Sequence, residues 1–179
     1  DGNAPEGAAS VVYFILKINS RAQTEEKLGA ILEKIARVES KPVADYITQY
    51  RFDEDLSFNI CHLPVRHLAA KIFGSLFSVL DEHYYVVLDN YLVFSGSVEA
   101  LKSLINDFIL NKTLKNEPAF KEFRDNISPR YNLVFYCNLS KSQPFFSSYL
   151  TASLNKAWQQ NLGVFRNIQV MGMQLNASN

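Results

Sequence analysis

The amino-acid sequence predicts an α+β fold in which helices pack in layers on a mainly antiparallel sheet. Three observations predict this class: short runs rich in β-branched and aromatic residues, segments whose apolar residues recur at helical spacing, and an order in which hairpins alternate with helices. The 179 residues are 47% hydrophobic and 20% charged, which is typical of a chain that buries a core. We expect a single domain over residues 11–176, preceded by a flexible lead-in at residues 1–10.

The domain is expected to begin with a strand and a helix. Residues 11–18 are nearly all β-branched, aromatic or otherwise apolar, as in a strand that is buried on both faces. Thr24 is the expected cap of the helix that follows, because Glu25 and Glu26 then occupy the first turn, where the helix dipole favours anions. The apolar face of this helix consists of Leu28, Ile31, Leu32 and Ile35.

A hairpin and a second helix are expected next. Residues 46–52 and 56–63 are strand-like, and the acidic residues 53–55 suit a solvated turn between them. Pro64 stands where a helix would begin. Seven apolar residues have the spacing of one face of this helix: Val65, Leu68, Ala69, Ile72, Phe73, Leu76 and Phe77.

The middle of the chain predicts another hairpin and another helix. Residues 84–88 and 91–95 flank Asp89-Asn90, a dipeptide that tolerates the positive φ angles of a two-residue turn. Ser97 is the expected cap of the next helix. The apolar face of that helix consists of Val98, Leu101, Leu104, Ile105 and Phe108.

Four further elements complete the expected fold. A short helix begins near Pro118 and ends before Pro129. A strand at residues 132–139, a helix at residues 144–160 and a strand at residues 168–175 follow it.

The order of the elements also indicates a more detailed arrangement. The first six elements follow the β-α-β-β-α-β order of ferredoxin-like folds, and a related second half follows them. The domain would then contain sub-units at residues 11–89 and 91–176. Because the chain stops soon after a strand-like run, we expect it to be a fragment of a longer protein.

Composition narrows the classes of partner. Lys plus Arg and Asp plus Glu each number 18, so the formal charge is zero, and without a basic surface we expect no nucleic-acid partner. No run approaches the roughly 18 apolar residues that cross a bilayer, so membrane contact would come only through an anchor outside this fragment. Cys61 and Cys137 are the only cysteines, and a disulfide or two separate thiols are both open alternatives.

No recognisable motif carries chemistry. His62 and His67 are five residues apart, which does not place two imidazoles on one helix face, and residues 53–55 and 81–83 lack the ligand pattern of a calcium loop. Neither a nucleophile elbow nor a glycine-rich phosphate loop occurs. We therefore expect no metal, no cofactor and no enzymatic activity, with an enzyme built from scattered carboxylates as an alternative.

The run from Tyr91 to Ile105, with the pattern Y-L-V-F-x-x-S-x-E-A-L-K-x-x-I, resembles a family of uncharacterised bacterial cell-envelope proteins described only as a domain of unknown function. Residues 112–114, 120–123 and 132–138 are similar to that family's order of strand, capped helix, short helix and strand. The resemblance covers residues 65–150 and extends only loosely to the first sixty.

The resemblance implies an extracytoplasmic protein of the periplasm or cell envelope that is membrane-anchored in its full-length form. It supplies no catalytic residue. The partners that it implies are other envelope proteins or the missing remainder of the same chain.

Aromatic residues supply the candidate binding surface. The chain contains 9 Tyr, 13 Phe and 1 Trp, and an exposed aromatic patch would mark a contact site. The candidates are Tyr84, Tyr85, Tyr91 and Tyr131. The function expected first is a structural or protein-interaction module of an envelope protein. The alternative is a binding module for an apolar or glycan-like ligand held between the helices and an aromatic face of the sheet.

Overall fold

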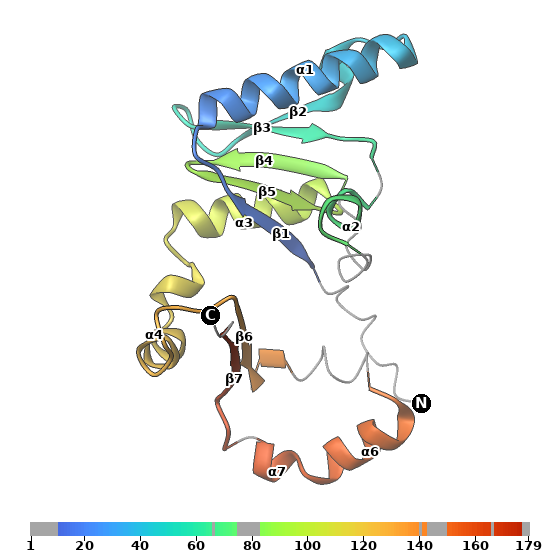
Figure 1. Cartoon of the computed structure of the whole chain (residues 1–179). Coiled ribbons are helices and arrows are strands. Elements are labelled where there is room, and N and C mark those ends of the chain that lie inside the picture. Colours follow the sequence, from blue (N-terminus) through green and yellow to red (C-terminus); the bar gives the residue numbers. More distant parts are fainter. Residues whose placement is uncertain are drawn as a thin grey trace. The chain divides into compact units, whose positions relative to one another are not determined.

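The computed structural model describes residues 11–65, 67–74, 83–139, 141–142, 150–165 and 167–176. It confirms the α+β class, with a five-stranded antiparallel sheet, a two-stranded sheet and several helices (Figure 1). The chain divides into two compact units: an N-terminal unit, Val11–Leu110, and a C-terminal unit that contains the described residues from Asn111 onward. The single domain expected over residues 11–176 stays a prediction beside these two compact units. Their boundary differs from the one expected near residue 90, because Asn90 lies in the turn of a hairpin.

The N-terminal unit is built on a sheet with the order β1-β5-β4-β3-β2, in which every neighbouring pair is antiparallel. Its strands are β1 (Tyr13–Lys17), β2 (Ile47–Arg51), β3 (Ser57–His62), β4 (Tyr84–Leu88) and β5 (Tyr91–Ser95). Both expected hairpins, β2–β3 and β4–β5, are confirmed, and Asp89 in the second turn has a φ of 47°. The ferredoxin-like arrangement expected for residues 11–89 is not confirmed, because β1 pairs with β5, a strand outside that segment.

Helix α1 (Arg21–Glu39) covers one face of this sheet (Figure 1). It begins one turn earlier than expected, because Ser20 is the cap and its hydroxyl accepts a hydrogen bond from the backbone N–H of Gln23. The prediction that Thr24 is the cap is wrong. Thr24 lies inside the first turn, where its hydroxyl donates to the backbone carbonyl of Ser20 over 2.8 Å.

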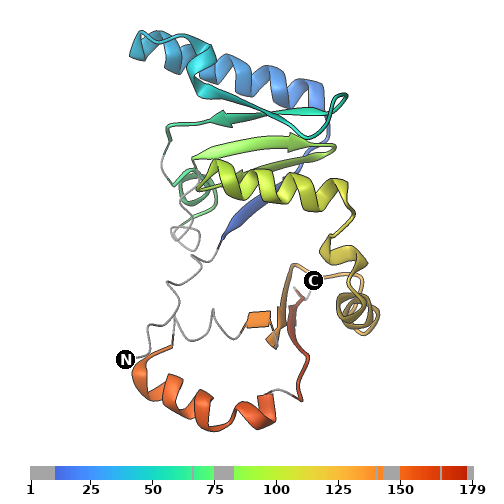
Figure 2. The same cartoon turned by 180° about the vertical axis from the view of Figure 1, so that it is seen from behind.

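Helix α3 (Val98–Ile109) packs on the opposite face of the sheet (Figure 2). Ser97 caps it as expected, since the Ser97 hydroxyl accepts a hydrogen bond from the backbone N–H of Ala100. Leu101 and Ile105 of this helix are fully buried. The sheet is therefore covered on both faces.

Two cores follow from this layering, because successive strand residues point to opposite faces. The core beneath α1 contains Leu32, Ala36, Tyr46, Cys61, Leu63, Tyr85, Val87, Leu92 and Phe94. The core beneath α3 contains Ile60, Val86, Leu88, Val93, Leu101 and Ile105. A one-residue slip of β4 or β5 would exchange both sets, so the two cores fix the register. The first strand, β1, was expected to be buried on both faces, but it lies at an edge of the sheet and Ile15 is 51% exposed. Burial on both faces is found instead in the central strands β4 and β5.

Two shorter elements complete the N-terminal unit. The 3-10 helix η1 (Val43–Tyr46) carries Tyr46 into the core beneath α1. Helix α2 (Leu68–Phe73) is shorter than the helix expected from Val65 to Phe77, and residues 75–82 lie outside the described part of the chain.

The C-terminal unit contains a 3-10 helix, three α-helices and a two-stranded antiparallel sheet within its described residues. Its elements are η3 (Leu114–Asn116), α4 (Pro118–Asp125), β6 (Leu133–Asn138), α6 (Ala152–Gln160), α7 (Leu162–Phe165) and β7 (Val170–Leu175). The short helix that begins at Pro118 and the strands β6 and β7 are confirmed. The helix expected over residues 144–160 is found from Ala152 onward, and residues 143–149 lie outside the described part.

The C-terminal unit does not repeat the architecture of the first, because its sheet has two strands where the N-terminal sheet has five. The related second half that was expected is therefore not confirmed. None of the described helices is long and apolar enough to cross a membrane.

Candidate functional site

Strands β6 and β7 form a ribbon, one face of which is covered by α4. The Tyr136 ring packs edge-on against Phe120, with 5.0 Å between ring centroids, and its centroid lies 5.1 Å from that of Phe123. Gly172 is the cross-strand partner of Tyr136, and a Cβ at Gly172 would collide with the ring of Phe123. Glycine is therefore required where the helix approaches the strand.

The other face of the ribbon is apolar and exposed at five positions, while Cys137, which lies on it opposite Met171, is buried. The register places Leu133 opposite Leu175 and Phe135 opposite Met173, on the face away from Tyr136. We call the exposed apolar residues of this face the apolar ribbon face: Leu133, Phe135, Met171, Met173 and Leu175. Their exposed fractions run from 44% for Phe135 to 53% for Met173. These five apolar side chains are neighbours on the ribbon and form one exposed patch rather than scattered surface residues.

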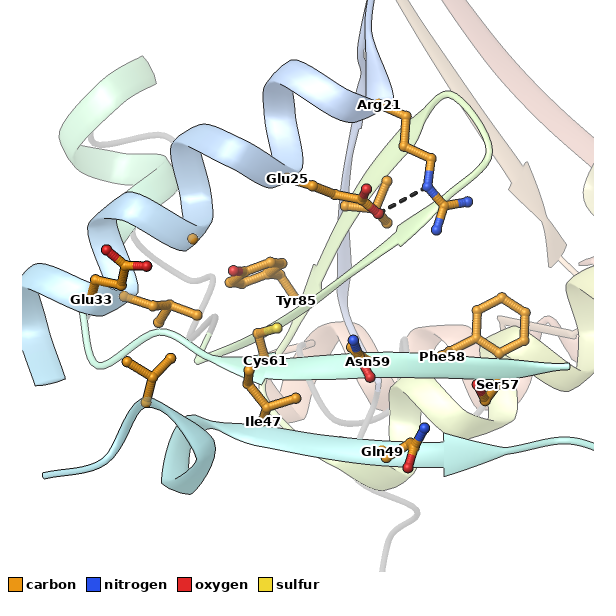
Figure 3. Close-up of a pocket in the computed structure, with 14 residues that line it drawn as sticks. Arg21, Glu25, Glu33, Ile47, Gln49, Ser57, Phe58, Asn59, Cys61 and Tyr85 are labelled. Atoms are coloured by element: carbon orange, nitrogen blue, oxygen red, sulfur yellow. Dashed lines mark hydrogen bonds and ion pairs between the residues drawn. The ribbon is translucent and has the colours of Figure 1, made fainter.

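The N-terminal unit contains a pocket of about 460 Å³ between α1 and the sheet, which we call the α1 pocket (Figure 3). Its upper wall is one side of α1, where four residues recur at every fourth position: Arg21, Glu25, Gly29 and Glu33. Its lower wall comes from β2, β3 and β4 and includes Ile47, Gln49, Ser57, Asn59, Cys61 and Tyr85.

Polar groups lie toward the rim of the α1 pocket. The Arg21 guanidinium pairs with the Glu25 carboxylate, with 2.9 Å between Nε and Oε1. Gln49 and Asn59 are cross-strand partners on the face of the sheet that α1 covers, so their amides lie side by side. Figure 3 shows these two amides on neighbouring strands below the helix.

The base of the α1 pocket is uncharged. Cys61 and Tyr85 are buried there. Burial raises the pKa of the Cys61 thiol, and it also raises the pKa of the Tyr85 hydroxyl. Both groups are therefore neutral at physiological pH, and the base offers an aromatic ring and a thiol rather than a reactive anion.

The tyrosines that were expected to form an exposed surface are dispersed. Tyr85 is only 5% exposed, so the prediction that it is exposed is wrong. Tyr84 is half-buried against His62, and Tyr91 is exposed at the opposite end of the β4–β5 hairpin. Tyr131 belongs to the C-terminal unit, where it is 51% exposed. The three tyrosines of the N-terminal unit do not form one patch, because Tyr85 faces the other side of the sheet from Tyr84, and Tyr91 lies at the far end of the hairpin.

The cysteines and histidines occupy structural positions. Cys61 and Cys137 are free, buried thiols, each within its own unit. His62 stacks on Tyr46 with 6.1 Å between ring centroids, and burial lowers the pKa of His62. His67 is the residue that precedes α2. In the described residues, no three His, Cys, Asp or Glu side chains are grouped so as to hold a metal ion.

The residues of the α1 pocket carry no sequence motif. Gly29, Gln49 and Asn59 come from a helix and two strands, and they meet only through the long-range register of the sheet. One signal was present in the sequence. Gln49 and Asn59 are polar at positions that alternate with Tyr50, Phe58 and Ile60, which predicts that this side of the two strands stays accessible to solvent.

Comparison with known proteins adds no family assignment. No protein-family model matches the chain, and neither a curated protein nor a solved structure matches it. The resemblance to the envelope family therefore stays a prediction from the residues. Inference about function depends on the apolar ribbon face and the α1 pocket.

Proposed function

We propose that this chain is a non-enzymatic protein-interaction module of a bacterial cell-envelope protein, and that the apolar ribbon face is its contact surface. One observation carries the proposal: five apolar side chains share one face of a two-stranded ribbon, and each is about half exposed. The envelope compartment, and an anchor outside this fragment, come from the resemblance alone. The partners are other envelope proteins or the remainder of the same chain.

The energetics of the ribbon support a protein partner. A two-stranded ribbon is marginally stable in water unless a helix or further strands pack on it, and α4 supports only one of its faces. Covering the other half of each exposed side chain would contribute about 1 kcal/mol per residue, roughly half the value for complete burial. Met171 and Met173 also suit a contact surface, because the unbranched thioether side chain adapts to the shape of a partner.

The test compares the protein with a variant in which Phe135 and Met173 are both replaced by serine. These residues are cross-strand partners in the middle of the apolar ribbon face, and the backbone hydrogen bonds of the ribbon do not depend on them. We expect the wild-type protein to capture a partner from solubilised bacterial envelopes and the double variant to lose it. The matched control replaces Ile31 and Val38, which are exposed apolar residues of α1, with glutamine.

Capture alone does not locate the contact, so the captured protein is then purified and hydrogen exchange is measured with and without it. Protection of residues 133–138 and 170–175 would support the proposal. Capture that survives the double substitution, or protection confined to other residues, would contradict it. Binding of the wild-type protein to protein-free phospholipid vesicles, lost in the same variant, would reassign the face to a lipid surface.

A further inference from the structure

The α1 pocket is independent of the apolar ribbon face, because all of its residues belong to the N-terminal unit. We infer that it binds a small, uncharged, hydroxyl-rich ligand of the sugar or polyol class. Its volume of about 460 Å³ falls within the range of roughly 300–1,000 Å³ that small-molecule sites occupy. The chemistry of its walls decides the class of ligand.

Gly29 helps to keep the pocket open. It is the only glycine of α1, and it lies on the pocket side of the helix between Glu25 and Glu33. A Cβ at Gly29 would meet no atom within 4 Å, so the space beside this position is empty rather than filled by a neighbour. Glycine weakens a helix interior, and nothing packed against the helix here requires it. A longer side chain at Gly29 would enter the pocket.

The amides of Gln49 and Asn59 are the main recognition groups. They lie opposite each other on β2 and β3, both are exposed at the mouth of the pocket, and neither side chain makes a hydrogen bond with any other residue that the structure describes. Each amide offers two N–H donors and one carbonyl acceptor, while the carboxylates of Glu25 and Glu33 accept only. Adjacent hydroxyl groups match this set, because each hydroxyl donates one hydrogen bond and accepts others.

Charge and polarity argue against other classes of ligand. Arg21, Glu25 and Glu33 sum to a formal charge of −1 around the pocket, and Arg21 is already paired with Glu25. A phosphate or carboxylate would therefore be repelled. A purely apolar ligand would cover both amides without offering them partners, which costs free energy. A cation would find one carboxylate, that of Glu33, which makes no ion pair with the other described residues.

The base of the pocket suits the less polar face of a sugar ring. Tyr85, Leu32 and Val87 line it, and they belong to the core beneath α1. Figure 3 shows the ring of Tyr85 lying between α1 and Cys61. A ligand that places C–H groups against this base and hydroxyls toward Gln49 and Asn59 would satisfy both parts of the pocket.

The experiment titrates the full chain with glucose, N-acetylglucosamine and maltose and follows backbone amide resonances by NMR. Inorganic phosphate, toluene and putrescine are the anionic, apolar and cationic comparison probes. We expect at least one saccharide to shift the resonances of Gly29, Gln49 and Asn59 in a saturable way. The three comparison probes should not produce such shifts at the same concentrations.

Three variants make the test specific to the pocket. Gly29→Leu fills it and should abolish saccharide binding, whereas Ala30→Leu, at the neighbouring exposed position of the same helix, should leave the affinity unchanged. Asn59→Ala removes one hydrogen-bonding group without filling the space and should weaken binding about tenfold. Circular dichroism of each variant checks that α1 is retained.

Two results would overturn the inference. One is the absence of saturable saccharide shifts at the pocket, or saccharide binding that Gly29→Leu and Asn59→Ala leave unchanged. The other is tighter binding of phosphate, toluene or putrescine at the same resonances. Because the apolar ribbon face lies in the other unit, either result leaves the proposed protein contact standing.

Discussion

Gly172 shows how a single residue sets the distance between two elements of this protein. It lies on β7 opposite Tyr136, and the ring of Phe123 occupies the space that a Cβ would need. We expect Gly172→Ala to push α4 from the ribbon and to destabilise the C-terminal unit by about 1–3 kcal/mol, as overpacking does.

Thermal unfolding followed by near-ultraviolet circular dichroism measures the effect of this substitution. Gly163→Ala is the matched control, because a Cβ at Gly163 meets no atom within 4 Å in the same unit. That variant should be neutral or slightly more stable. Equal melting temperatures for the two variants would show that α4 does not pack on the ribbon as described.

Ser97 is a second residue whose role is local and measurable. Its hydroxyl accepts a hydrogen bond from the backbone N–H of Ala100 at the start of α3. Ser97→Ala should lower the free energy of unfolding by about 1 kcal/mol in urea denaturation, since an N-terminal N–H of the helix loses its partner. Ser103→Ala, on the exposed side of the same helix, should change it much less.

Glu39 ties the end of α1 to η1. Its carboxylate accepts hydrogen bonds from Lys41 Nζ at 2.8 Å and from the Tyr46 hydroxyl at 2.7 Å, and these bonds lower the pKa of Glu39. A carboxylate of lowered pKa stabilises the fold above its unfolded-state pKa, and the contribution is lost as pH falls through the folded-state pKa.

Tyr46→Phe should therefore raise the pKa of Glu39 toward its ordinary value in an NMR titration. The variant should be less stable than wild type at neutral pH. The part of this difference in free energy of unfolding that comes from the ionised Glu39 carboxylate should shrink as the pH falls and Glu39 becomes protonated. Tyr91→Phe, at an exposed position of β5, is the control. An unchanged titration of Glu39 in Tyr46→Phe would contradict the assignment of the pKa shift.

At the scale of elements, local sequence signals predicted the hairpins, but the pairing between strands far apart in the sequence was not predicted. The acidic residues 53–55 and the pair Asp89-Asn90 marked turns that the structure confirms. The neighbour of β1 is set instead by cross-strand pairs such as Phe14 with Phe94, more than seventy positions apart in the chain. No local pattern specifies such a pairing. The ferredoxin-like arrangement was predicted from the order of the elements alone, and it is not confirmed because that order does not determine which strands are neighbours.

The apolar ribbon face was partly detectable in the sequence. In β6 both alternating sets of positions carry apolar residues, and in β7 the set Met171, Met173 and Leu175 is wholly apolar, which predicts that this side of the ribbon packs against something. The sequence does not say how many strands join them, and among the described residues the sheet stops at two. The tyrosines predicted to form a binding surface lie outside the apolar ribbon face, since aromatic content alone does not tell which side of a strand is covered.

Elements of the two units should differ in local stability. Residues 85–88 and 92–95 are buried between α1 and α3, whereas the ribbon is covered on one face. Native-state hydrogen exchange should therefore show β4 and β5 exchanging last, with the amides of β6 and β7 at least about tenfold faster. Equal protection of all four strands would contradict the conclusion that β4 and β5 are covered on both faces and the ribbon on only one.

At the scale of the whole molecule, the two cores of the sheet lie entirely within one unit. Every residue of both cores falls between Val11 and Leu110. A protein comprising residues 11–110 should therefore fold alone and unfold in one cooperative urea transition. A broad, non-cooperative transition would show that the N-terminal unit depends on the rest of the chain.

The proposed function assigns contact with a partner to the C-terminal unit, and site-specific photocrosslinking tests this most directly. A benzophenone amino acid replaces Phe135, Met173 or Val38, and each variant is irradiated together with solubilised bacterial envelopes. We predict a discrete crosslinked protein from the first two positions and none from Val38, which is 85% exposed on α1. No adduct at Phe135 and Met173, or the same adduct at all three positions, would contradict the account.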